Sequence, residues 1–255
     1  MILRRITEHV KAQNWFAVAL DFLIVVLGVF VATQVANWNA ARGERAAEAG
    51  YLSALEGDIT FSIASLETLV VQLETQEAAR QRLFAYASDP AAEIAPEELD
   101  LLVKQGIFHL PSINISQITF DTLKSSGRLT VLRSPELVAA LQELEAQVAA
   151  ALVTQADELQ VTYLFTDPML VENFDMLGVF QQPGLGGAKS IAWLPDQRAI
   201  SDVPEIAKSQ RFRNAVLYRS YFAQSRIASL NAILAEHKKI AGLIDARQAR
   251  LGAAP

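Results

Sequence analysis

The chain has 255 residues, 51% of them hydrophobic, with a formal net charge of −6 and no cysteine. A chain without cysteine cannot form disulfides, thiolate zinc sites, iron–sulfur clusters or cysteine nucleophiles. The charge is uneven, at +2 over residues 1–14, −13 over residues 37–204 and +6 over residues 205–255. A mainly acidic body argues against nucleic acid as a partner. Only 12 glycines and 9 prolines are present, which favours long helices over turn-rich β-structure.

A long apolar segment, Trp15 to Ala36, lies near the start of the chain. Its 22 residues include a single ionisable side chain, Asp21. As a helix the segment would span roughly 33 Å, about the thickness of the hydrocarbon core of a bilayer. It is longer than the apolar region of a secretory signal peptide, and no small-x-small cleavage site follows it. We therefore predict an uncleaved transmembrane helix over residues 15–37, with the lipid bilayer as its surroundings.

The flanks of this segment predict its orientation. Trp15 and Trp38 are 23 residues apart, the spacing expected for aromatic side chains at the two membrane interfaces. The N-terminal flank is basic and the far flank is neutral. The positive-inside rule then places residues 1–14 in the cytoplasm and residues 38–255 outside. In a bacterium this means a single-pass protein of the inner membrane with a periplasmic domain.

One face of the predicted transmembrane helix carries Asp21, Gly28 and Ala32. Gly28 and Ala32 form a small-xxx-small pattern, which allows two helices to approach closely. A carboxylate within the span costs a few kcal/mol unless it is hydrogen-bonded. Two interpretations stay open. Either the spacing arises by chance on a helix that faces lipid, or this face packs against a second copy or another membrane protein.

These residues also carry a resemblance. The acidic residue that opens the apolar run, the mid-span Gly28 and the sequence Asn37-Trp38-Asn39 resemble an uncharacterised bacterial family of single-pass membrane proteins, a domain of unknown function. The segment Phe120–Gly127, which closes on Ser-Gly, resembles a second pattern of that family. The resemblance implies an N-terminal anchor and an α-helical extracytoplasmic domain, and no catalytic residues. The family has mostly glutamate at the acidic position, where this chain has the shorter aspartate.

Beyond the anchor the pattern becomes amphipathic, and we predict three long helices over residues 42–87, 134–165 and 205–250. Leucine and isoleucine follow a heptad seam in the first of them. A dimeric stalk would also show such a seam, but the wide apolar stripe favours a bundle. The sequence leaves open whether this helix continues from the transmembrane segment. The fold class is therefore all-α, an antiparallel bundle of long helices that follows one N-terminal transmembrane helix.

Local signals predict where the helices begin and end. Ser116 is a predicted N-cap for a short helix that stops at Gly127, and Asp202 is a predicted N-cap for the last helical region. The sequence Ser134-Pro135-Glu136 is a strong helix start. We expect Asp167-Pro168 to end that helix. Further short helices are expected between residues 97 and 126.

The glycine-rich run Pro183–Ser190 does not have the spacing of a phosphate-binding loop, because Ala188 separates its glycines from Lys189. We expect it to cap one end of the bundle, with Trp193 pointing inward.

No catalytic constellation is evident. The three histidines are scattered, and no carboxylate pair lies in a helical metal motif. We expect no enzymatic activity, cofactor or metal.

The basic C-terminal region has a candidate contact for an anion or a partner at Arg211, Tyr218 and Arg219, although its charges could equally pair with acids of the first long helix. The preferred function is a protein-interaction or scaffold module that binds itself or another membrane protein. The alternative is a periplasmic ligand-sensing bundle that signals through a membrane partner. A polar cavity at these three residues would favour sensing, and a filled core with an apolar surface patch would favour partner binding.

Overall fold

The computed structural model describes residues 15–182, 193 and 203–253, and every regular element among these residues is a helix, with no strand. The elements, in chain order, are α2 (Trp15–Ser88), α3 (Pro96–Val103), the π-helix η1 (Lys104–Phe108), α4 (Ile118–Ser125), the 3-10 turn η2 (Leu129–Val131), α5 (Pro135–Val161), the π-helix η3 (Thr162–Thr166), α6 (Asp167–Asn173), α7 (Met176–Gln181), the 3-10 turn η4 (Glu205–Lys208) and α8 (Gln210–Gly252). The predicted all-α class is confirmed.

The chain forms two compact units, residues 1–51 and residues 52–255. Helix α2 begins in the first unit and ends in the second, so the first long helix does continue from the apolar segment. Two helical stretches of the described chain are long and apolar enough to cross a membrane, Ala19–Ser88 and Pro135–Asn173. The apolar window of the first is entirely exposed, whereas that of the second is 33% buried. The first is the candidate membrane span, and the second packs within unit 2.

Unit 2 is built from three helices with heptad seams: residues 52–88 of α2, together with α5 and α8. Their buried positions alternate in steps of three and four, the spacing of a coiled-coil seam. On α2 these are Leu52, Leu55, Ile59, Ser62, Leu66, Leu69, Leu73, Gln76, Arg80, Leu83 and Ala87; on α8 they are Phe212, Val216, Arg219, Ala223, Arg226, Leu230, Ile233, His237, Ile240 and Ile244.

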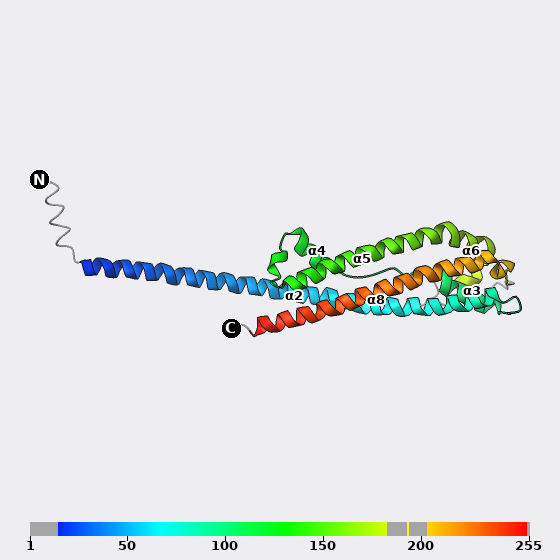
Figure 1. The fold of residues 1–255 in the computed structure, drawn as a ribbon, viewed down its shortest axis with the longest axis horizontal. Coiled ribbons are helices and arrows are strands. Elements are labelled where there is room, and N and C mark those ends of the chain that lie inside the picture. Colours follow the sequence, from blue (N-terminus) through cyan, green and yellow to red (C-terminus); the bar gives the residue numbers. More distant parts are fainter. Residues whose placement is uncertain (1–14, 183–192, 194–202, 254–255) are drawn as a thin grey trace. The chain divides into compact units, whose positions relative to one another are not determined.

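Helix α8 runs antiparallel to its neighbours in unit 2 (Figure 1). Arg213, near its start, donates to the carbonyl oxygen of Ala87, and Gln248, near its end, donates to Glu56. Figure 1 shows α5 running in the same direction as α2, so the chain must return along the bundle between them. Residues 109–117 lie outside the helices and make this return.

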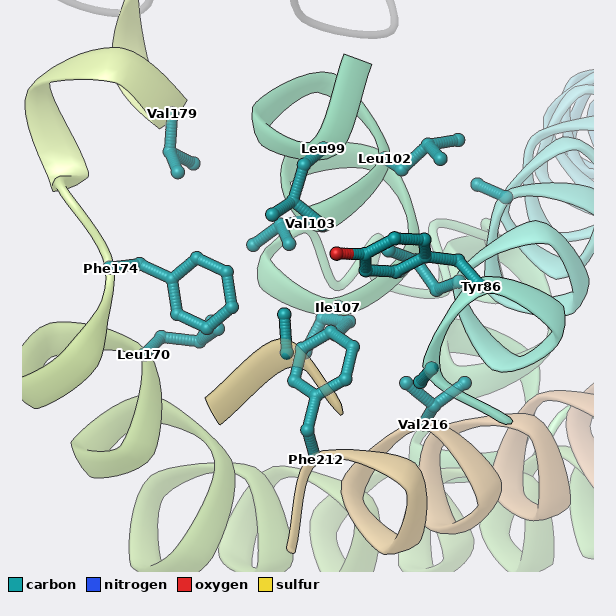
Figure 2. Close-up of a cluster of buried hydrophobic side chains, with 14 of the residues drawn as sticks. Tyr86, Leu99, Leu102, Val103, Ile107, Leu170, Phe174, Val179, Phe212 and Val216 are labelled. Atoms are coloured by element: carbon teal, nitrogen blue, oxygen red, sulfur yellow. The ribbon is translucent and has the colours of Figure 1, made fainter. Parts of the chain in front are cut away.

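One end of unit 2 holds a compact apolar core, where the last turns of α2 meet the first turns of α8. Helices α3, α6 and α7 close this end, and Figure 2 shows their side chains converging. The rings of Phe174 and Phe212 have centroids 5.6 Å apart. Lys208 donates to three carbonyl oxygens in the last turn of α2 and the loop after it, those of Tyr86 (2.9 Å), Asp89 (2.6 Å) and Ala92 (2.7 Å). The bond to Tyr86 satisfies one of the carbonyls that a helix end leaves without a partner.

Two predicted helix boundaries are confirmed. The hydroxyl of Ser134 accepts a hydrogen bond from the Leu137 amide, and Pro135 is the first residue of α5. Gly127, which follows the end of α4, has a φ of 68°, a conformation that favours glycine. These signals succeed because caps and glycine stops act within a few residues.

Ser116 is not the N-cap of α4, because its hydroxyl donates to Asp58 Oδ1 (2.6 Å). Asp58 instead accepts the Thr119 amide through Oδ2 (2.8 Å), so α2 supplies the capping carboxylate. Burial alone would raise the pKa of Asp58, but the hydrogen bonds from Ser116 and Thr119 outweigh it, and the pKa is lowered. A tertiary contact has replaced the local cap.

Four other expectations are wrong or lie outside the described residues. Pro168 does not end its helix: the π-helix η3 shifts the hydrogen-bond register just before it, so Pro168 enters α6 in the first turn, where its missing N–H costs little. Trp193 does not point inward, since its side chain is 80% exposed. The glycine run 183–190 and Asp202 fall outside the described residues. The last long helix, predicted from residue 205, begins at Gln210 with Ser209 as its N-cap, and residues 205–208 form the 3-10 turn η4.

Candidate functional site

A buried ionic cluster lies at the centre of unit 2, between α5 and α8. The Glu158 carboxylate accepts hydrogen bonds from Arg219 (2.6 Å, at Oε1) and Arg226 (2.9 Å, at Oε2). All three residues are at most 2% exposed. Burial lowers the pKa of Arg219 to about 10, an effect that Glu158 partly offsets, so the guanidinium remains charged at neutral pH. One carboxylate thus serves two buried cations.

The same cluster holds the returning segment 109–116, which we call the strap. An extended segment inside a helical bundle cannot satisfy its own backbone groups, so other groups must do so. Arg219 donates to the His109 carbonyl (3.3 Å) and Arg226 to the Pro111 carbonyl (2.6 Å). The Ile113 amide donates to the Gln155 side chain (3.0 Å).

The seam of α2 supplies the remaining strap contacts. Gln76 donates to the His109 carbonyl (3.1 Å), and Ser62 accepts the Ser116 amide (2.9 Å). One turn from Gln76, the buried Arg80 donates to Glu77 (2.8 Å) and to the Gly106 carbonyl (2.9 Å). The polar residues of these seams therefore hold backbone in place, which is a structural role.

A cavity of about 590 Å³ lies beside this cluster, between the η3–α6 turn and the start of α8. Its apolar walls are Val161, Phe165, Met169 and Ala215. Its polar lining consists of Thr166, Gln210, Arg211, Asn214 and Tyr218. Pockets of 300–1,000 Å³ with mainly apolar walls and a few polar groups are typical of small-molecule sites.

Arg211 differs from the other arginines in this part of α8. Arg213 donates to two carbonyl oxygens, while Arg219 and Arg226 bond Glu158. Arg211 is exposed and makes no hydrogen bond or ion pair with the described part of the chain. The cavity therefore contains a guanidinium with unused donors.

Exposed aromatic side chains lie at the cavity. Phe165 and Tyr218 both line it, yet they are 67% and 60% exposed. Tyr221, 70% exposed, lies on the same face of α8 one turn beyond Tyr218. We call Phe165, Tyr218 and Tyr221 the aromatic surface. Exposed apolar side chains that gather in this way mark interaction sites.

The structure separates the three residues predicted as one contact. Arg211 and Tyr218 line the cavity, but Arg219 lies in the buried cluster and does not line it. The predicted pairing with acids of α2 occurs between Lys238 and Glu67 (2.8 Å), whereas the buried arginines of α8 pair with α5.

The predicted transmembrane contact residues Asp21, Gly28 and Ala32 are exposed on the first unit. A Cβ built on Gly28 meets no atom within 4 Å, so this face of α2 is open. Packing of this face against another helix stays a prediction.

Sequence reasoning missed Glu158, Thr166 and Met169 as parts of these sites. A usable signal was present: Arg219 and Arg226 are seven residues apart and fall on the seam positions between Val216 and Leu230. Arginines at seam positions must be buried, which requires a buried acid on a neighbouring seam.

No group of three or more histidine, cysteine, aspartate or glutamate side chains that could hold a metal occurs among the residues that the structure describes. Comparison with known proteins found no matching family model, no matching characterised protein and no matching solved structure.

Proposed function

We propose that this chain is a non-enzymatic interaction module anchored in the bacterial inner membrane. The start of α2 would cross the membrane, with residues 1–14 in the cytoplasm and unit 2 in the periplasm. The exposed apolar window of Ala19–Ser88 and the basic N-terminal flank support this arrangement. The proposed kinship with the uncharacterised single-pass family is consistent with it and adds no activity.

The observation that carries partner binding is the aromatic surface. Tyrosine and phenylalanine provide large contact areas at low cost in conformational entropy, and tyrosine is enriched among the residues that dominate binding energies. Phe165 and Tyr221 come from different helices and are 67% and 70% exposed. Leu217, 49% exposed, extends the apolar face of α8. A protein partner that covered these side chains would remove this apolar area from water.

Photocrosslinking in intact membranes tests this proposal. A photoreactive phenylalanine analogue at Phe165 or Tyr221 should give the same crosslinked protein from both positions. The matched control is Ser125, an exposed residue of α4 outside the aromatic surface. Adducts that form equally well at Ser125, or none at Phe165 or Tyr221, would contradict partner binding at this surface.

The second contact that we propose is the face of α2 that carries Asp21, Gly28 and Ala32. It would pack against a second copy or another membrane protein, with the Asp21 carboxyl hydrogen-bonded across the contact. A membrane-helix association reporter should lose signal with Gly28→Ile and with Asp21→Leu. If both variants keep the wild-type signal, this face is exposed to lipid.

The cavity favours a second candidate function, a ligand-sensing bundle that signals through a membrane partner. Its supporting observation is Arg211, whose donors are unused in the described chain and face a space of ligand size. Both functions can coexist, because Phe165 and Tyr218 belong to the cavity wall and to the aromatic surface. A ligand would then change the surface that a partner covers.

A further inference from the structure

We infer that the cavity between η3–α6 and α8 binds a single-chain amphiphile with an anionic head, either a carboxylate or a phosphate on an unbranched apolar chain. This inference rests on the ligand-sensing candidate and names the class of its ligand. It does not depend on the aromatic surface binding a protein.

The head group is identified by the polar side of the cavity. Arg211, Asn214 and Tyr218 lie at i, i+3 and i+7 on one face of α8, so their polar ends reach the same side of the space. A guanidinium binds carboxylate or phosphate through two parallel N–H···O bonds. The amide of Asn214 and the hydroxyl of Tyr218 can donate as well. These groups suit an oxyanion rather than a cation.

The buried cluster does not compete for this head group. Arg219 is committed to Glu158, to Thr162 (3.2 Å) and to the strap. Asp167, the acid next to the cavity wall in sequence, interacts electrostatically with Arg219, and burial raises its pKa. Arg211 is thus the cavity-lining cation with donors to spare among the described residues.

The tail is identified by the apolar part of the lining. The side chains of Val161, Phe165 and Met169 across from α8, and of Ala215 on α8 itself, present only carbon and sulfur, and Met169 is fully buried. An apolar chain gains from burial against such a wall, whereas a sugar or a free phosphate would leave it uncovered. A volume of about 590 Å³ exceeds what a small inorganic anion needs. Head and tail together therefore define an anionic amphiphile.

Photoaffinity labelling of the full chain in phosphatidylcholine nanodiscs tests the inference, with a diazirine-bearing analogue of dodecanoate as the probe. Label should appear in the peptides that contain residues 161–169 and 210–218. Dodecanoate or dodecyl phosphate should displace it, and the stronger competitor identifies the head group. Acetate, which has no tail, and dodecanol, which has no charge, should not.

Three variants sharpen the test. Arg211→Gln should raise the dodecanoate concentration needed for half-displacement about 10- to 100-fold, the cost of losing a charge-assisted contact. Arg250→Gln, an exposed arginine of the same helix far from the cavity, should leave it unchanged. Ala215→Trp should fill the cavity and abolish the label. Circular dichroism and thermal unfolding of each variant would show that the fold is kept.

Three results would overturn the inference: label spread over the chain, displacement by dodecanol as strong as by dodecanoate, or equal behaviour of Arg211→Gln and Arg250→Gln. The outcome is separable from partner binding. Crosslinks at Tyr221 together with failed labelling would leave the interaction module intact and remove only the amphiphile site.

Discussion

Replacing Glu158 by glutamine removes a carboxylate that two buried arginines share. Its two oxygens accept from different partners, Oε1 from Arg219 and Oε2 from Arg226. In the Glu158→Gln variant one of these positions becomes an NH₂ group, so a donor faces a guanidinium donor. The charge that compensates two cations, each at most 2% exposed, is lost as well.

Breaking a buried ion pair by removing one partner costs about 3–5 kcal/mol. A domain has a free energy of unfolding of about 5–15 kcal/mol, so the loss is a large part of the total. We expect Glu158→Gln to lower the free energy of unfolding of unit 2 by about 3–5 kcal/mol. Urea unfolding followed by pulse proteolysis of the full chain in nanodiscs measures this quantity.

The matched control is Glu67→Gln, which breaks the pair with Lys238. Both of these side chains are more than half exposed, at 51% and 54%, so the expected loss is below about 1 kcal/mol. If the two variants lose the same small amount, Glu158 does not hold the cluster together. Replacing Glu158, Arg219 and Arg226 together by leucine should restore only part of the stability, because the Pro111 carbonyl of the strap would lack the donor that Arg226 supplies and the His109 carbonyl would keep only Gln76.

Two further predictions concern the end of unit 2. Burial, and then the charge of Asp175, raise the pKa of Asp100 to about 6, above the ordinary 3.8, so its contribution to stability is present below pH 3.8 and is lost as the pH rises through 6. In urea unfolding at pH 8, Asp100→Asn should therefore have a higher free energy of unfolding than the wild type, by at most about 3 kcal/mol. This difference should vanish near pH 4. A difference that does not change with pH would refute the prediction. Lys208→Met should lower the free energy of unfolding by about 2–4 kcal/mol, because three carbonyl oxygens in the last turn of α2 and the loop after it each lose a hydrogen bond from a charged donor. Amide exchange at Tyr86 should quicken as that end loosens, and unchanged exchange would contradict the role of Lys208.

The fold followed from the sequence where its signals are local or periodic. The seam of α2, the start of α5 at Ser134 and the stop at Gly127 depend only on spacing or on neighbouring residues. The sequence could not show whether α2 continues from the apolar segment. No proline or other helix-breaking signal separates the two parts, but two helices can also be separated without such a signal.

What could not be predicted depends on contacts between distant residues. Asp58 caps α4 in place of Ser116, and Glu158 pairs with arginines more than 60 residues away. The candidate site was half predicted. Arg211 and Tyr218 do line a cavity, whereas the sequence could not show that Arg219, about 100° around α8 from Tyr218, points into the buried cluster and bonds the strap.

The chain has no cysteine, which makes its proposed topology directly measurable. Single cysteines at Thr7 and at Ser125, the latter exposed on α4, would be labelled in intact spheroplasts with a membrane-impermeant maleimide. The account predicts that Ser125→Cys is labelled at once and Thr7→Cys only after lysis, with both variants retained in the membrane after an alkaline carbonate wash. Labelling of Thr7→Cys from outside, or release of the protein by the wash, would contradict a periplasmic module on a single transmembrane anchor.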